Sequence, residues 1–110
     1  MLHYTVMQSE AADDRRSLSA AIFGNRAAAD VIRAIVDLTQ AGNQGVTTRM
    51  VARHAGLGDS IVRPVMLRLQ SAGTLATQPR DHGSRSALHY EVQPGDLWDA
   101  LRRVTEALPG

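Results

Sequence analysis

Arginine is the residue type in this sequence with the most evident chemistry. It supplies all twelve basic side chains, and six of them lie between positions 45 and 90, opposed by only two aspartates. The other positions hold six arginines and nine carboxylates, so a basic middle segment is flanked by acidic ends. A guanidinium group presents several N–H donors in a fixed fork, which suits phosphate groups and the edge of guanine. This distribution is typical of a domain that turns one face toward a polyanion, and a solvated arginine-rich face is the alternative.

Three candidate side chains share one predicted helix, at about residues 60–72. Arg63 has the reach to address the O6 and N7 atoms of guanine, whereas Ser60 and Arg68 suit phosphates or a nearby base edge. A surface salt bridge is the alternative role for Arg63. The apolar residues of this helix are expected to form one buried stripe: Ile61, Val62, Val65, Met66 and Leu69. A helix that is polar in front and apolar behind can enter the major groove of B-DNA, which is about 12 Å wide.

Two further residues of that helix, Pro64 and Leu67, belong to the same predicted DNA-binding surface. Pro64 lacks a backbone N–H, so we expect the helix to begin at Ser60 or to bend slightly near its first turn. Leu67 points toward the predicted DNA side, where it would contact either a thymine methyl group or a partner protein.

The second candidate contact is the start of the preceding helix, predicted within residues 47–55. Thr47 can cap this helix through its side chain. The unpaired backbone amides there, together with Thr48 and Arg49, could hold a phosphate at the positive end of the helix dipole. A purely structural cap is the alternative, and the two roles are compatible.

The third candidate contact is the tip of a β-hairpin. The segments TLATQ at 74–78 and ALHYEVQ at 87–93 have the composition of strands, and the breaker cluster PRDHGSRS around Gly83 separates them. Arg80, His82 and Arg85 lie at this tip, where the two guanidinium groups could reach the minor groove beside the helix. Alternatively, these side chains only keep a loop soluble.

The elements before the basic segment must hold these groups in place. Residues 3–8 are predicted to be extended, and a brief helix follows at Ser17–Phe23, ended by Gly24. Asn25 is expected to cap the longest helix, which ends near Gly42. The apolar positions of this helix are Ala28, Val31, Ile32, Ile35 and Leu38, and its other side carries Asp30, Arg33 and Asp37.

The elements after the helix within residues 47–55 are predicted from the same kinds of signal. A Gly-Leu-Gly turn at 56–58 leads to Asp59 or Ser60, either of which can cap the next helix. Asp96 is expected to cap a last helix within 95–108. Its apolar positions form a candidate dimerisation surface: Leu97, Trp98, Leu101, Val104 and Leu108. This stripe could instead cover the core of its own chain. A twofold dimer would place two reading helices one DNA turn, about 34 Å, apart.

The order helix, glycine turn, helix and hairpin is that of a winged helix-turn-helix. The stretch GVTTRMVARHAGLGDSIVRPVMLRLQSAGTL (45–75) resembles the DNA-binding domains of bacterial regulators of the MarR, ArsR and GntR types. The matching positions are Ile61-Val62, Met66, Leu69, Ala72-Gly73 and Leu75, and AIFGN at 21–25 is similar to the start of the first long helix in ArsR-type repressors. The resemblance covers about residues 21–92, and it implies a homodimeric regulator or repressor of transcription that binds double-stranded DNA.

The sequence therefore predicts one domain over residues 1–110, mainly α with a small β-hairpin wing (α+β). It comprises an N-terminal arm and short helix (1–24), a winged helix-turn-helix core (25–92) and a C-terminal helix (95–108). The helix at about 60–72 would lie in the major groove and the wing, at about 74–92, beside the minor groove. Two alternatives of the same fold are a protein–protein interaction module and a plasmid or phage replication or partition protein.

Several classes of function are not expected. No cysteine is present, and the four histidines, His3, His54, His82 and His89, lack metal-ligand spacing, so no disulfide or metal site is predicted. No catalytic motif is evident, so we predict neither an enzyme nor a cofactor, and no motif indicates a small-molecule effector. No apolar run approaches the about 18 residues of a membrane span and no signal peptide is evident, so the cytoplasm is the expected location.

Overall fold

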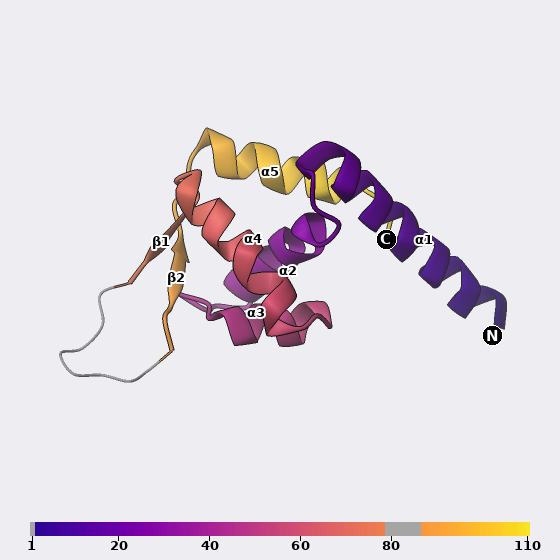
Figure 1. Ribbon diagram of the computed structural model, residues 1–110, viewed down its shortest axis with the longest axis horizontal. Coiled ribbons are helices and arrows are strands. Elements are labelled where there is room, and N and C mark those ends of the chain that lie inside the picture. Colours follow the sequence, from indigo (N-terminus) through magenta and orange to yellow (C-terminus); the bar gives the residue numbers. More distant parts are fainter. Residues whose placement is uncertain (1, 79–86) are drawn as a thin grey trace.

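The computed structural model describes residues 2–78 and 87–110. This part of the chain contains five helices and one two-stranded antiparallel sheet, in the order α1 Leu2–Phe23, α2 Ala28–Gln40, α3 Thr48–Ala55, α4 Asp59–Ser71, β1 Leu75–Thr77, β2 Tyr90–Val92 and α5 Asp96–Ala107. The predicted order of helix, turn, helix and hairpin is present, which confirms the winged helix fold. The hairpin and the N-terminal end of α1 lie at opposite ends of a molecule 52 Å long (Figure 1).

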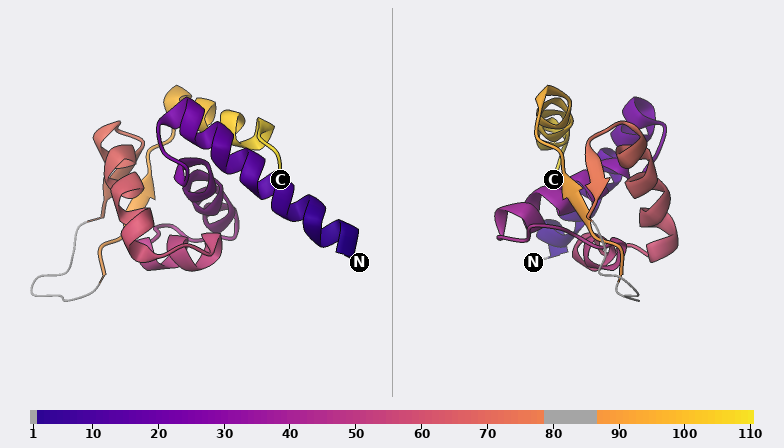
Figure 2. Two further views of the ribbon diagram at one scale, coloured as in Figure 1. Left: turned by 45° about the vertical axis from the view of Figure 1, so that its right-hand side comes forward. Right: turned by 90° about the vertical axis from the view of Figure 1, so that its left-hand side faces the viewer.

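The core forms around α2, which contacts each of the other four helices. Val31, Ile32 and Ile35 of α2 are almost completely buried, which confirms the apolar stripe predicted for this helix. Val51 and Ala52 of α3 are buried beside them. In each view of Figures 1 and 2, α5 lies on the side of α2 opposite α3. The central helix thus joins the helix-turn-helix half of the molecule to its terminal helices.

The N-terminal segment corrects the sequence analysis. Residues 3–8, predicted to be extended, belong to α1, which is one continuous helix of 22 residues. The run HYTVMQ is too short for its pattern to distinguish a strand from a helix. No glycine or proline interrupts positions 2–23, and the alanines, arginines and leucines among them favour a helix. Gly24, with a φ of +69°, follows the last residue of α1 as predicted.

Two side chains hold the turn between α1 and α2. The Ser19 hydroxyl, fully buried, donates to the Asn25 carbonyl at 2.6 Å and accepts from the Ala29 N–H at 3.0 Å. The Asn25 side chain accepts from the Ala27 N–H at 2.8 Å. The position directly before α2 is Ala27, which makes no side-chain cap. The prediction that Asn25 caps this helix is therefore wrong, since its side chain stabilises the preceding turn instead.

A buried ion pair joins α1 to α2. Asp30 is 7% exposed, and its carboxylate accepts from Arg15 at 2.5 Å and from Arg16 at 3.4 Å. The prediction that Asp30 faces away from the core is wrong because α1 is long enough to cover that side of α2. Two guanidinium groups compensate the burial of one carboxylate, which would otherwise be unfavourable.

Two predicted helix caps also need correction. Gly58, with extended backbone, precedes α4, so the helix begins at Asp59 and neither Asp59 nor Ser60 caps it through a side chain. Gly95 precedes α5 in the same way, and Asp96 is the first residue of that helix rather than its cap. Both aspartates lie in the first turn, where the helix dipole favours a negative charge. The sequence located both helix starts to within one residue but assigned the acidic side chain the wrong position.

The buried stripe of α4 is narrower than predicted. It consists of Val62, Val65, Met66 and Leu69, whereas Ile61 is 51% exposed. Ile61 points about 100° away from Val62 and about 90° away from the centre of the stripe around the helix axis, so it lies outside the buried face. The prediction that Ile61 is buried is therefore wrong.

The hairpin is tied to the helix-turn-helix by a contact that the sequence did not predict. β1 and β2 are antiparallel, with Thr77 opposite Tyr90, which confirms the predicted hairpin. Val46, just before α3, forms a further bridge to Tyr90 through two backbone hydrogen bonds of 2.8 Å. The base of the wing and the start of α3 are therefore held together. The predicted tip around Gly83 lies outside the described residues.

The C-terminal helix covers the core of its own chain with part of its predicted dimerisation stripe. Trp98 is 7% exposed and belongs to the core, and Leu101 packs against it. Val104 and Leu108 are half-buried, while Leu97 is 52% exposed. Trp98 therefore covers the core of its own chain, which was the alternative to a dimer contact. Leu97 is the most accessible residue of the stripe.

Candidate nucleic-acid interface

Four of the predicted DNA-binding residues surround one hollow of about 370 Å³, which we call the basic hollow. Its walls come from the start of α3, the start of α4 and the base of β2. The lining residues are Thr47, Thr48, Arg49, Asp59, Arg63, Ala87, Leu88 and Tyr90. The start of α3 and the reading helix, treated as separate contacts in the sequence, thus share one surface with the base of the wing.

The start of α3 is a capped helix N-terminus, as predicted. Thr47 has extended backbone, and its hydroxyl accepts from the Met50 N–H at 3.1 Å. The cap satisfies one amide of the first turn, and the other amides there have no partner within the helix. These N–H groups carry the positive end of the helix dipole, beside the Arg49 side chain. The bridge from Val46 to Tyr90 holds this end of α3 against the wing.

The cationic side chains of the basic hollow are available to a ligand. Arg49 and Arg63 are both exposed, and no ion pair joins either of them to another residue within the described ranges. The salt bridge considered for Arg63 thus has no partner in that part of the chain. Asp59 lines the same hollow and was not assigned to the site by sequence reasoning. It offsets one of the two positive charges without pairing to either.

The exposed residues of α4 include three apolar side chains beside its polar ones. Ser60, Ile61, Pro64 and Leu67 are all exposed on this helix, and Leu67 is 46% accessible. Pro64 is accommodated within α4, which continues to Ser71. The DNA-facing positions predicted for Ser60, Pro64 and Leu67 are therefore accessible. Ile61, which was expected in the core, is also exposed, but it points about 120° away from Leu67 around the helix.

Arg68 lies apart from the basic hollow. It follows Arg63 by five residues, so the two side chains point about 140° apart around α4. Arg68 lines a different, mainly apolar hollow of about 180 Å³ together with Phe23, Leu97 and Leu101. The structure thus brings Arg63 to the start of α3 but places Arg68 on the flank of α4 that faces α1 and α5.

The predicted wing contacts cannot be placed in the same way, since Arg80, His82 and Arg85 fall outside residues 2–78 and 87–110. Their contacts stay predictions. Leu88 and Tyr90, which line the basic hollow, were recognised from their alternation as strand residues but not as part of the site. The alternation signals which side chains turn inward, and it carries no information about the helix they meet.

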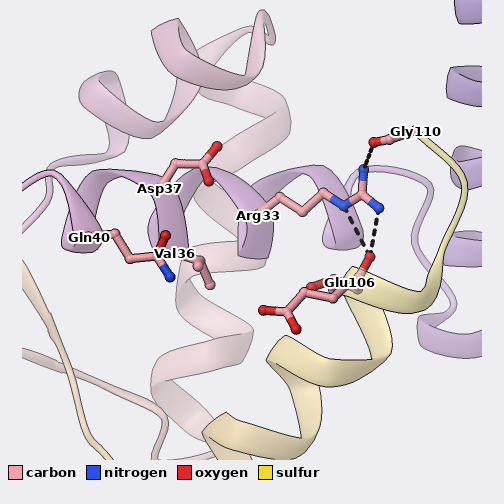
Figure 3. A pocket seen from close by; sticks show the side chains of 7 residues that line it. Arg33, Val36, Asp37, Gln40, Glu106 and Gly110 are labelled. Atoms are coloured by element: carbon pink, nitrogen blue, oxygen red, sulfur yellow. Dashed lines mark hydrogen bonds between the residues drawn. The ribbon is translucent and has the colours of Figure 1, made fainter.

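A second hollow, of about 350 Å³, lies between α2 and the end of α5, and Figure 3 shows the arginine at its centre. Arg33 donates to the carbonyl oxygens of Thr105 and Leu108 at 2.7 Å each and of Gly110 at 2.8 Å. Burial, with the charge of Arg15 nearby, lowers the pKa of Arg33 from its usual value, against an opposing effect of Asp30. Arg33 was expected to face away from the core, but it anchors the C-terminal end of α5.

No cluster of three or more His, Asp or Glu side chains suited to a metal ion occurs among the residues with described positions. His54 contacts Asp37 at 3.0 Å, an exposed pair between α3 and α2. None of the helices within the described ranges is both long and apolar enough to cross a membrane.

Comparison with known proteins finds similarity in structure but not in sequence. No family model matches the sequence, and no curated protein is similar to it in sequence. The structure is similar to the crystal structure of a transcriptional regulator of the MarR family from Silicibacter pomeroyi, with a TM-score of 0.67 and 14% sequence identity. The match covers 94% of this chain and 64% of that chain, so this chain spans less than two thirds of its neighbour's length. At this identity the likeness is one of fold: the chain has a winged helix architecture similar to that of this neighbour.

Proposed function

We propose that this chain binds double-stranded DNA and regulates transcription, with α4 in the major groove. The observation that carries the proposal is the basic hollow, in which Arg49, Arg63 and the start of α3 meet on one exposed surface. Arg63 extends from α4 and would address a guanine edge or a nearby phosphate. Arg49 and the amides at the start of α3 would bind the phosphate backbone beside it. The fold shared with a transcriptional regulator supports the same assignment.

The wing completes the proposed interface. The bridge between Tyr90 and Val46 holds β2 beside the basic hollow. In the proposal, the wing lies along the minor groove next to α4, where Arg80 and Arg85 would meet its negative potential. His82 belongs to the same predicted contact. Arg68, on the opposite flank of α4, is at most a peripheral phosphate contact in this arrangement.

The salt dependence of DNA binding tests this function. If about six phosphates are neutralised, affinity for a duplex should fall about 1,000-fold between about 50 and 200 mM salt, because each contact releases counterions. The measurement is a titration of the chain into fluorescently labelled duplex, taken from a randomised pool enriched by binding to the protein, over a series of salt concentrations. Failure to enrich any duplex, or affinity that changes less than twofold over this range, would contradict the proposal.

Dimerisation through the terminal helices is part of the proposal. Among the side chains whose exposure is described, at residues 10–78 and 87–110, the strongly exposed large hydrophobic ones lie on α4 and on the pair α1 and α5. Leu18 and Ile22 are 40% and 54% exposed on α1, and Leu97 is 52% exposed on α5. Phe23 and Leu97 line the same apolar hollow, which brings the end of α1 close to α5. Burial of these side chains against a second copy would remove apolar surface from water.

The exposed patch formed by Leu18, Ile22 and Leu97 predicts that the chain is a dimer in solution. We expect the chain to sediment at twice its mass of 11.9 kDa, and the Ile22→Glu and Leu97→Glu variants to sediment as monomers. A glutamate buried in the interface without a partner opposes association. Both positions are exposed in the single chain, so the variants should keep the fold. The exposed Gln40→Glu change on α2 is the matched control and should leave the dimer intact. Sedimentation velocity makes the comparison, and an unchanged mass for both patch variants would contradict this interface.

A second candidate function is a winged helix module that binds another protein. The specific observation in its favour is that two large apolar side chains of α4, Ile61 and Leu67, are about half exposed. These side chains could pack into an apolar groove of a partner protein. This second function predicts that the affinity for a partner protein depends on these two residues and changes little with salt concentration, in contrast to the affinity for DNA. A cytoplasmic location and a role on a chromosome, plasmid or phage belong to the first proposal and stay predictions.

A further inference from the structure

We infer that Asp59 determines base specificity in the proposed DNA complex: its carboxylate accepts a hydrogen bond from the N4 amino group of a cytosine in the major groove. This inference rests on the proposed DNA binding. It adds a base contact that the arginines of the basic hollow cannot make, because a guanidinium group only donates hydrogen bonds and a carboxylate only accepts them.

Asp59 lies at the N-terminal end of the helix proposed to enter the groove. It is the first residue of α4, it is exposed, and it lines the basic hollow together with Arg63. The Cα–Cβ bonds of a helix tilt toward its N-terminus, so the Asp59 side chain is directed toward the start of α4. Arg63 follows four residues later, only about 40° further around the helix axis. Because the N-terminal residues of a reading helix contact base edges, Asp59 is well placed for such a contact.

The Asp59 carboxylate is not used by its own helix or by the neighbouring arginines. Its side chain does not cap α4. Arg49 and Arg63 line the same hollow, yet no ion pair joins either of them to Asp59 within residues 2–78 and 87–110. A carboxylate on a surface that binds phosphates repels them and lowers the affinity for DNA in general. Asp59 therefore favours DNA binding only where a base offers a donor to it.

Two bases present an amino group in the major groove, and cytosine suits a carboxylate better than adenine does. Adenine N6 lies between two acceptors, its own N7 and the O4 of the paired thymine, and both repel a carboxylate. Cytosine N4 has an acceptor on one side only, the O6 of the paired guanine, which is an atom that Arg63 could address. Against guanine or thymine, the carboxylate would lose water without gaining a hydrogen bond. Asp59 and Arg63 together thus complement a G·C pair.

N4-Methylcytosine tests the inference, because it pairs with guanine as cytosine does while its methyl group replaces the amino hydrogen that faces the major groove. The probe is the duplex enriched from a randomised pool by the whole chain, resynthesised with N4-methylcytosine at one cytosine at a time. We expect the affinity to fall about tenfold at the cytosine that contacts Asp59, which is a typical effect of losing one base contact.

Variants assign this effect to the protein. Asp59→Ala should bind the cytosine and N4-methylcytosine duplexes with equal affinity at that position. It should also bind an unrelated duplex at least as tightly as the unchanged chain does, because a charge that repels phosphates is removed. Asp96→Ala is the matched control, since Asp96 is the exposed first residue of α5 and also follows a glycine. Both variants lose a first-turn carboxylate, but only Asp59→Ala should lose the discrimination.

Two results would overturn this inference and leave DNA binding in place. One is an enriched duplex whose affinity is unchanged by N4-methylcytosine at every position. The other is a loss of affinity with N4-methylcytosine that is as large for Asp59→Ala as for the unchanged chain. Failure to enrich any duplex would instead remove the proposed function.

Discussion

Replacing Arg49 and Arg63 together by alanine is expected to weaken binding of the enriched duplex by about 100-fold. The two side chains line one hollow from different helices, and no carboxylate among the described residues pairs with either. Loss of Arg63 removes a base or phosphate contact of about 1–3 kcal/mol, and loss of Arg49 removes a phosphate contact. Both are exposed, so the free energy of unfolding should change by less than about 0.5 kcal/mol.

The two single variants should lose affinity for DNA in different ways. Arg49→Ala should weaken all duplexes to a similar extent and reduce the salt slope by about one. Arg63→Ala should also relax the preference at one base pair if it contacts guanine, and it should behave like Arg49→Ala if it contacts phosphate. Arg103→Ala is the control, since Arg103 is exposed on α5, far along the chain from both helices. An unchanged affinity for the double variant would exclude the basic hollow as the DNA-binding site.

Asp30→Ala is expected to lower the free energy of unfolding by about 2–4 kcal/mol, and the midpoint of thermal unfolding by about 10–20 °C. Asp30 is buried on α2 beneath Arg15 and Arg16 of α1, and the Arg15 side chain is itself only 16% exposed. Removal of the carboxylate leaves a largely buried guanidinium without its counter-charge. Thermal or urea unfolding followed by circular dichroism measures the change.

Asp37→Ala provides the matched comparison on the same helix. Asp37 is 58% exposed, and its one ion pair among the described residues is with His54, so its loss should lower the free energy of unfolding by less than about 0.5 kcal/mol. Asp30→Asn should lie between the two, because an amide keeps the shape and can accept one hydrogen bond but carries no charge. Equal effects of Asp30→Ala and Asp37→Ala would show that the contact of α1 with α2 contributes little to stability. The same result would weaken the case for α1 as a fixed part of a dimer interface.

Helices with a regular apolar period were accessible to sequence reasoning. α2 and α3 are where the spacing of Val31, Ile35 and Val51 predicts them, because a period of 3.6 residues follows directly from helix geometry. Thr47 could be identified as a cap because its hydroxyl bonds an amide only three residues away. Local chemistry of this kind needs no knowledge of the rest of the fold.

The errors occurred where distant parts of the chain decide the environment. Asp30 was expected to face away from the core, and it is buried because α1 covers it. Ile61 was assigned to the core, and it is exposed because α4 meets its neighbours over a narrower face. Trp98 was a candidate for an intersubunit surface, and it belongs to the core because α5 lies on α2. In each case the residue type permits either environment, and the neighbour that selects one is many positions away.

For the candidate site, the sequence by itself determined which chemistry is present: arginines, a capped helix start and a reading helix between glycine turns. Only the tertiary structure decided which of these groups act together. The bridge from Val46 to Tyr90 sets the wing against α3, and the rotation of α4 turns Arg63 toward that hollow and Arg68 away from it. The physical reason is that a helix period fixes the angles between side chains along one helix, whereas the direction in which the whole helix faces depends on what it packs against.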